Sequence, residues 1–97
     1  MILRVEAGGV TLVDLDDLHR LSAHVVDGAA IGAWGRAEDG HVVVTTQTLL
    51  RLAGERAGDE RWRGEFDGMV DNARRHGWVQ DDEVRMHVVD VSGDRRG

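Results

Sequence analysis

Five side chains with distinct chemistry fall on a predicted β-hairpin and on a predicted C-terminal β-strand. Trp34, Arg36 and His41 belong to the hairpin, and Arg85 and His87 to the C-terminal strand. Guanidinium groups bind carboxylates and phosphates, an indole stacks on flat rings, and imidazole transfers protons near neutral pH. If the two strands are neighbours and present these side chains on one face, the set forms a site for an anionic or aromatic small molecule.

Two classes of function are compatible with this set. In the first, the protein is a non-catalytic interaction or regulatory module, and the face around Trp34 binds a partner protein or a second copy. In the second, it is a small cofactor-independent enzyme of the isomerase, lyase or cyclase type. His41 and His87 would then be the acid and base, and Arg36 and Arg85 the anion clamps. We favour the first class, because the sequence contains no nucleophile elbow, phosphate loop or dinucleotide fingerprint.

The placement of the first three residues depends on a hairpin predicted over residues 29–45. Asp39-Gly40 is typical of a two-residue turn. The resulting pairs are Glu38 with His41, Arg36 with Val43, and Trp34 with Thr45. A three-residue loop would fit equally and would shift this register by one. A last strand, predicted over residues 84–91, supplies the other two residues.

A second hairpin is predicted over residues 2–13. Gly8-Gly9 can supply the positive φ angles of a two-residue turn. This loop places Ala7 opposite Val10 and Val5 opposite Leu12, so apolar side chains share one face.

Three helices are predicted between these strands, over residues 14–27, 46–57 and 59–76. Their expected N-caps are Asp14, Thr45 or Thr46, and Asp59. The last helix has the clearest period, given by Trp62, Phe66, Met69, Val70 and Ala73. Gly77 is expected to end this helix, with Trp78 packing back into the core.

The resulting order, ββαββααβ, predicts a single α+β domain over residues 1–91. We expect a small, mainly antiparallel sheet of two hairpins plus a C-terminal strand, with the three helices packed on one face. Residues 92–97 are expected to form a flexible polar tail.

The amino-acid composition and net charge argue against several classes of function. The chain has 97 residues with 12 basic and 18 acidic side chains, a net charge of −6, and every basic residue is Arg. It contains no cysteine, so disulfides and thiolate chemistry are excluded, and we expect no metal and no cofactor. No segment has the length of a membrane span, and the acidic charge argues against nucleic acid. We expect a cytoplasmic protein.

The element order of residues 41–89 resembles the second half of a winged-helix domain. A predicted strand and two helices are followed by Gly77-Trp78-Val79, a polar turn at residues 80–82, and another strand. The resemblance implies that the helix over 59–76 reads DNA and that the final hairpin is the wing. Beyond its Asp59 cap, that helix carries four acidic side chains beside four arginines, and the turn is acidic. DNA binding therefore remains a second alternative.

Overall fold

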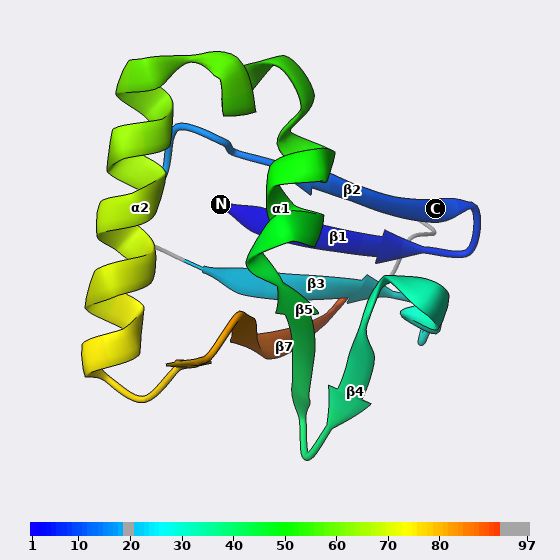
Figure 1. Cartoon of the computed structure of the whole chain (residues 1–97). Helices are drawn as coiled ribbons and strands as arrows, with labels where there is room; N and C mark the ends of the chain where they lie inside the picture. Colours follow the sequence, from blue (N-terminus) through cyan, green and yellow to red (C-terminus); the bar gives the residue numbers. More distant parts are fainter. Residues whose placement is uncertain (19–20, 92–97) are drawn as a thin grey trace.

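The computed structural model describes residues 1–18 and 21–91, which form one mixed sheet of seven strands with two α-helices (Figure 1). The strands are β1 (Ile2–Glu6), β2 (Gly9–Val13), β3 (Ser22–Val26), β4 (Arg36–Glu38), β5 (His41–Thr45), β6 (Val79–Gln80) and β7 (Glu83–Val91). The helices are α1 (Thr46–Ala53) and α2 (Glu60–Arg75), with short 3₁₀ turns η1 (Gly32–Trp34) and η2 (Gly54–Gly58). The expected tail, residues 92–97, lies outside the described residues.

Both predicted hairpins belong to the same sheet, whose strand order is β2-β1-β3-β7-β5-β4, with β6 pairing to β7. β3 runs parallel to β1 on one side and to β7 on the other, and the remaining pairs are antiparallel. The expected α+β class is therefore confirmed. The predicted sheet, mainly antiparallel and made of two hairpins plus a C-terminal strand, is incomplete, because the sheet also contains β6 and, in two parallel pairs, β3.

The predicted helix over residues 14–27 is wrong, because its second half is the central strand β3. Asp14, the expected N-cap, has φ of 51°, which is incompatible with the extended conformation of an N-cap residue. The main chain of β3 pairs with strands on both sides, which places Ala23 in the core. The apolar residues of this segment have the spacing of a helix face, although the segment contains a turn and then a strand. The described chain thus contains two α-helices where three were predicted.

The register of the N-terminal hairpin differs from the prediction by two residues. Its loop is Ala7-Gly8, and Val5 faces Val10. Because the side-chain period of a strand is two, this shift leaves the same apolar residues on the core face.

The hairpin of β4 and β5 has the predicted two-residue turn and the predicted register, with Arg36 opposite Val43. Its first strand is shorter than expected. Residues 32–34 form η1, so Trp34 lies outside β4, and its predicted pairing with Thr45 is wrong.

The two α-helices begin at the predicted caps. The Thr45 side chain accepts a hydrogen bond from the Thr48 amide, and Asp59 accepts from the amides of Arg61 and Trp62. α2 ends in a Schellman motif, in which the Trp78 amide donates to the Ala73 carbonyl and the Gly77 amide to the Arg74 carbonyl. Among the described residues, neither helix combines the length and apolarity that a bilayer crossing requires.

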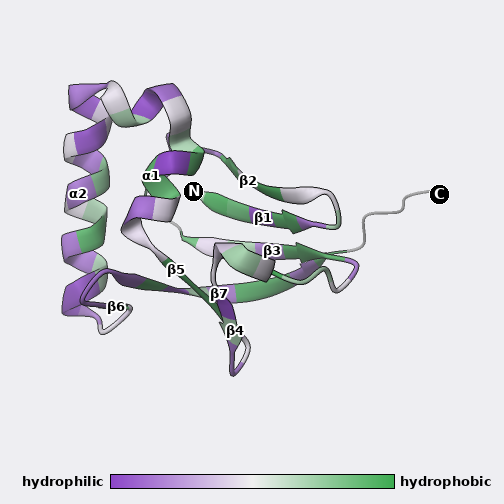
Figure 2. Ribbon diagram, turned by 45° about the vertical axis from the view of Figure 1, so that its right-hand side comes forward, coloured by the Kyte–Doolittle hydropathy of each residue, from purple (hydrophilic) through white to green (hydrophobic). Residues whose placement is uncertain are grey.

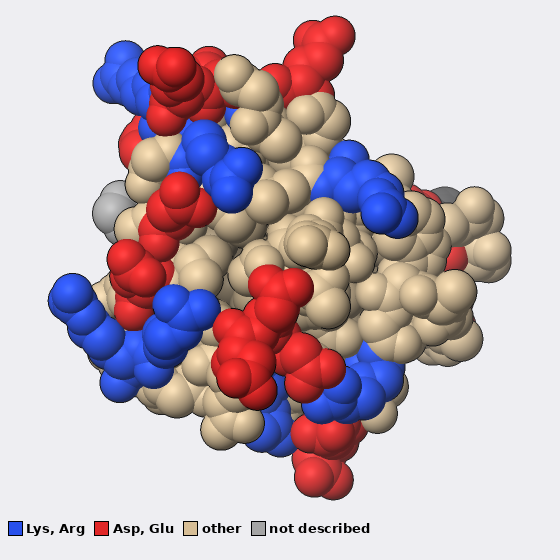
Figure 3. All heavy atoms as spheres, in the orientation of Figure 1, with Lys and Arg blue, Asp and Glu red and all other residues tan. Residues whose placement is uncertain are grey.

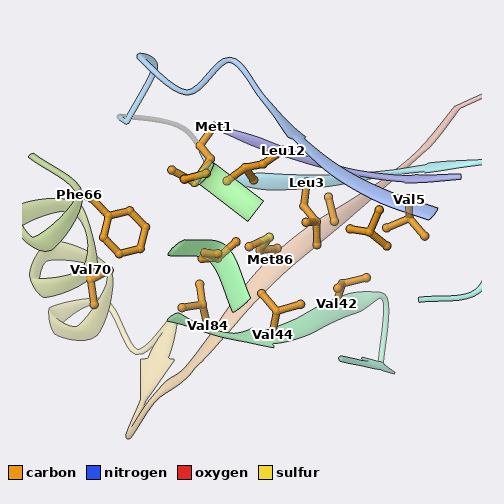
Figure 4. Close-up of a cluster of buried hydrophobic side chains, with 14 of the residues drawn as sticks. Met1, Leu3, Val5, Leu12, Val42, Val44, Phe66, Val70, Val84 and Met86 are labelled. Carbon is orange, nitrogen blue, oxygen red and sulfur yellow. The ribbon is translucent and has the colours of Figure 1, made fainter. Parts of the chain in front are cut away.

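The core lies between the sheet and the helices. α1 lies over one face of the sheet, and α2 stands beside it near the ends of the strands (Figures 1 and 2). Phe66 and Val70 of α2 point toward the strand side chains beneath α1, among them Leu3, Val44 and Met86 (Figure 4). Trp62 stacks on Phe66 with ring centroids 5.2 Å apart, and its Nε1 donates to the Leu15 carbonyl at 2.7 Å. This last bond ties the β2–β3 connection to α2.

A glycine in the middle of α2 provides a first testable prediction. A Cβ at Gly64 would meet no atom within 4 Å, so this glycine serves no close helix crossing. Gly64→Ala should therefore stabilise the protein by up to about 1 kcal/mol, through the higher helix propensity of alanine. Urea unfolding followed by circular dichroism measures this change. A loss of stability would show that the helix packs more closely there than described.

Candidate functional site

One face of the sheet is covered by neither α-helix, and we call it the open face. Strand alternation places Val84 and Met86 of β7 in the core, so Arg85, His87 and Val89 point to the open face. The registers add His41 of β5, His24 of β3 and Arg4 of β1 to this face. Four of the five predicted site residues, namely Arg36, His41, Arg85 and His87, lie here together.

His41 and His87 are direct cross-strand partners. Their ring centroids are 5.9 Å apart, with the rings nearly perpendicular. His41 Nδ1 lies 3.0 Å from the carbonyl oxygen of Asp39, which can only accept, so Nδ1 carries the proton. The indole next to His41 belongs to Trp78, at a centroid distance of 6.5 Å. The prediction had placed Trp34 in this position and Trp78 in the core, yet 45% of Trp78 is exposed.

Arg36 and Arg85 belong to a network of four charges that includes Glu38 and Glu83. Arg36 binds Glu83 through both terminal nitrogens and Glu38 through Nε at 3.0 Å. Arg85 reaches Glu38 with an N–O distance of 3.6 Å. The two predicted anion clamps are thus already paired with carboxylates of the protein, and the network has no net charge.

The hydrogen bonds in this network shift the ionisation of both partners. The hydrogen bonds from Arg36 hold the pKa of the Glu83 carboxyl below its usual range. Glu83, and then Glu38, raises the pKa of the Arg36 guanidinium further above neutrality. Both groups therefore stay charged throughout the neutral range, and the pair is available for structural rather than proton-transfer roles.

A cleft of about 660 Å³ lies where the open face meets α2. The α2 wall includes Met69, Asn72, Ala73 and His76, and the sheet wall consists of Trp78, Arg85 and His87. Leu18 and Leu21, from the connection between β2 and β3, line it as well. The volume is in the range that small-molecule sites occupy. His41 is not part of the lining, so the two histidines of the predicted site do not share this cavity.

The polar side chains around the cleft differ in whether they have hydrogen-bond or ion-pair partners in the protein. Asp16 at its rim is ion-paired with Arg56, which lowers the pKa of this carboxyl. His76 Nδ1 lies 2.8 Å from the Asn72 carbonyl oxygen and must donate to it. The Arg85 side chain is 42% exposed at the cleft, whereas its Nε is buried and has no hydrogen-bond partner among the described residues, which is unfavourable for a donor.

Sequence reasoning missed the α2 wall of the cleft and the role of Trp78. It also overlooked that Glu38 and Glu83 would neutralise the arginines. The signal for the carboxylates was present, because each lies two residues from an arginine on the same strand and so shares its face.

Two pairs of opposite charges lie along α2. Arg63 Nε is 3.2 Å from Asp67 Oδ1, and Arg74 Nη1 is 3.5 Å from Asp71 Oδ1. Basic and acidic side chains are interspersed over the face shown in Figure 3, which includes α2 and has no continuous basic area. Within the described residues, no three histidine or carboxylate side chains are grouped closely enough to hold a metal ion.

Comparison with known proteins identifies no matching family model, no similar curated protein and no similar solved structure. The function must therefore be argued from the open face and the cleft themselves.

Proposed function

We propose that this protein is a non-catalytic interaction module of the cytoplasm that binds a second copy of itself through the open face. The observation that carries the proposal is the charge of this face. Its strands present three arginines and three glutamates: Arg4, Arg36, Arg85, Glu6, Glu38 and Glu83. The other described residues include six basic and 14 acidic side chains.

The excess of negative charge among the described residues therefore lies away from the open face. Two copies of an acidic protein repel each other, and the repulsion is weakest where like surfaces without net charge meet. The charged side chains of this face are already paired internally, as in Arg4 with Glu6 at 3.0 Å. A second copy would leave these pairs in place.

Exposed apolar side chains support the same surface. Val13 on β2 and Val89 on β7 are exposed by 37% and 39%. Apolar side chains within a contact, surrounded by paired charges, are typical of association surfaces.

The catalytic alternative is supported less well. His41 and His87 are close together, but His41 lies outside the cleft, and the guanidiniums meant to hold a substrate anion are paired with Glu38 and Glu83. DNA binding as a winged-helix protein is opposed by the charges of α2, where acidic and basic side chains are mixed.

Light scattering tests the proposal. We expect the wild type to have twice the chain mass of 10.7 kDa. Val89→Arg should be monomeric, because it places an unpaired charge at the centre of the contact. Trp34→Ala is the control and should remain dimeric, since Trp34 lies in η1 rather than on the sheet.

Two outcomes would contradict this assignment. A monomeric wild type at submillimolar concentration would exclude self-association as the function. A dimer that is dissociated by Trp34→Ala but not by Val89→Arg would move the interface to η1. Added salt should strengthen the expected dimer, because it screens repulsion between the acidic remainders of the two copies.

A further inference from the structure

We propose that the cleft between α2 and the open face is a binding site for a small aromatic carboxylate. The inference goes beyond the proposed self-association and does not depend on it. Val89, the residue that tests self-association, is not part of the cleft lining.

The apolar part of the cleft suits a flat hydrocarbon. Leu18, Leu21, Met69 and Ala73 line it together with Trp78, whose indole is 45% exposed. An indole of this kind can stack on an aromatic ring, and a methionine can adapt to the ring edge. A cavity of about 660 Å³ has room for a ligand of one or two fused rings.

Arg85 is the reason for inferring that the ligand carries a carboxylate. Its side chain lines the cleft and is 42% exposed, and its closest carboxylate among the described residues, on Glu38, is 3.6 Å from Nη2. Arg36, by contrast, already uses Nε and both terminal nitrogens in hydrogen bonds to glutamates. Arg85 is therefore the arginine of the cleft lining, its terminal nitrogens retain donors for a ligand, and a carboxylate is the acceptor that a guanidinium prefers.

Glu65, on the α2 side of the cleft, limits the strength of this site. It is exposed and forms no ion pair with any described residue, whereas Asp16 is neutralised by Arg56. Its charge opposes an anionic ligand. The site should thus select a ligand with a single carboxylate and an extended apolar body over a small multivalent anion such as phosphate.

The test uses 1-naphthoate as the probe and 1-naphthalenemethanol as its uncharged counterpart, with binding followed by two-dimensional amide NMR. Wild-type protein should show saturable shifts from 1-naphthoate at the Trp78 indole and at amides near Ala73 and His87. The Trp62 indole, held by Leu15 in the core, should not shift. Arg85→Gln should weaken naphthoate binding about tenfold and leave the neutral probe nearly unaffected.

Arg4→Gln is the matched control, because it removes an arginine of the same face that neither lines the cleft nor belongs to the charge network of Arg85. It should leave naphthoate affinity unchanged. If Arg85→Gln does not fold, Glu65→Gln on the exposed side of α2 decides the question. Loss of this opposing charge should tighten naphthoate binding roughly threefold.

Naphthoate should bind to monomeric Val89→Arg as tightly as to the wild type, which separates this inference from self-association. The inference is overturned if naphthoate causes no saturable shifts at the cleft. It is also overturned if both probes bind equally well and equally in Arg85→Gln, or if Glu65→Gln leaves naphthoate affinity unchanged.

Discussion

Phe66→Ala is expected to destabilise the protein by about 3–5 kcal/mol. Phe66 is 1% exposed and stacks on Trp62, and it connects α2 to the core beneath α1 (Figure 4). Its truncation removes apolar contacts and leaves a cavity that the strands cannot fill. A domain of this length has a total stability of roughly 5–15 kcal/mol, so a large share is lost.

Urea unfolding monitored by circular dichroism measures the effect of Phe66→Ala, and Phe66→Leu should lose less because it leaves a smaller cavity. Asp67→Asn is the control on the exposed side of the helix. It removes only the surface pair with Arg63 and should change stability by less than about 1 kcal/mol. Equal losses in the alanine variant and the control would mean that α2 is not anchored by its aromatic pair.

Gly35→Ala should also be strongly destabilising, for a different reason. A Cβ at Gly35 would lie 2.3 Å from the carbonyl oxygen of Val43 and 2.8 Å from Cγ1 of Val44. The first contact is with the main chain of β5, so relief requires the backbone to move. We expect a loss of about 1–3 kcal/mol, as for other overpacked sites, with a disturbed β4–β5 pairing.

Gly58→Ala is the matched control, because a Cβ there would meet no atom within 4 Å. It should leave stability nearly unchanged. Thermal unfolding distinguishes the two variants, since 1 kcal/mol corresponds to roughly 4–8 °C in a domain of this size. Indistinguishable midpoints would contradict the close approach of Gly35 to β5.

Local signals in the sequence were sufficient for part of this fold. α2 was predicted because an aspartate cap, a helical apolar period and a terminal glycine all point to the same element. The β4–β5 register was predicted because Asp39-Gly40 favours one turn type. In both cases the residues that decide the structure are neighbours in the chain.

β3 was missed because its partners are distant. The apolar residues between 15 and 25 fit a helical period, and only pairing with β1 and β7 makes the second half extended. Two parallel strands are not joined by a hairpin, so no turn residue in the sequence indicates that they pair.

For the candidate site, too, one part could be predicted from the sequence and the other could not. The correct register of β4 and β5 brought Arg36 and His41 to one face, and β7 added Arg85 and His87. The cleft could not be predicted, because its walls come from α2, the β2–β3 connection and the open face together. Trp78 took the position expected for Trp34 because the Schellman ending of α2 turns the chain back toward β7.

The central position of β3 has a consequence for how the chain reaches its native state. β1–β2 and β4–β5 are hairpins that can form early from contacts close in sequence. The two halves of the sheet are joined only when β3 docks between β1 and β7, which closes long loops. The docking of β3 should therefore be the slow step of folding, and its amides should exchange with solvent only when the whole domain opens.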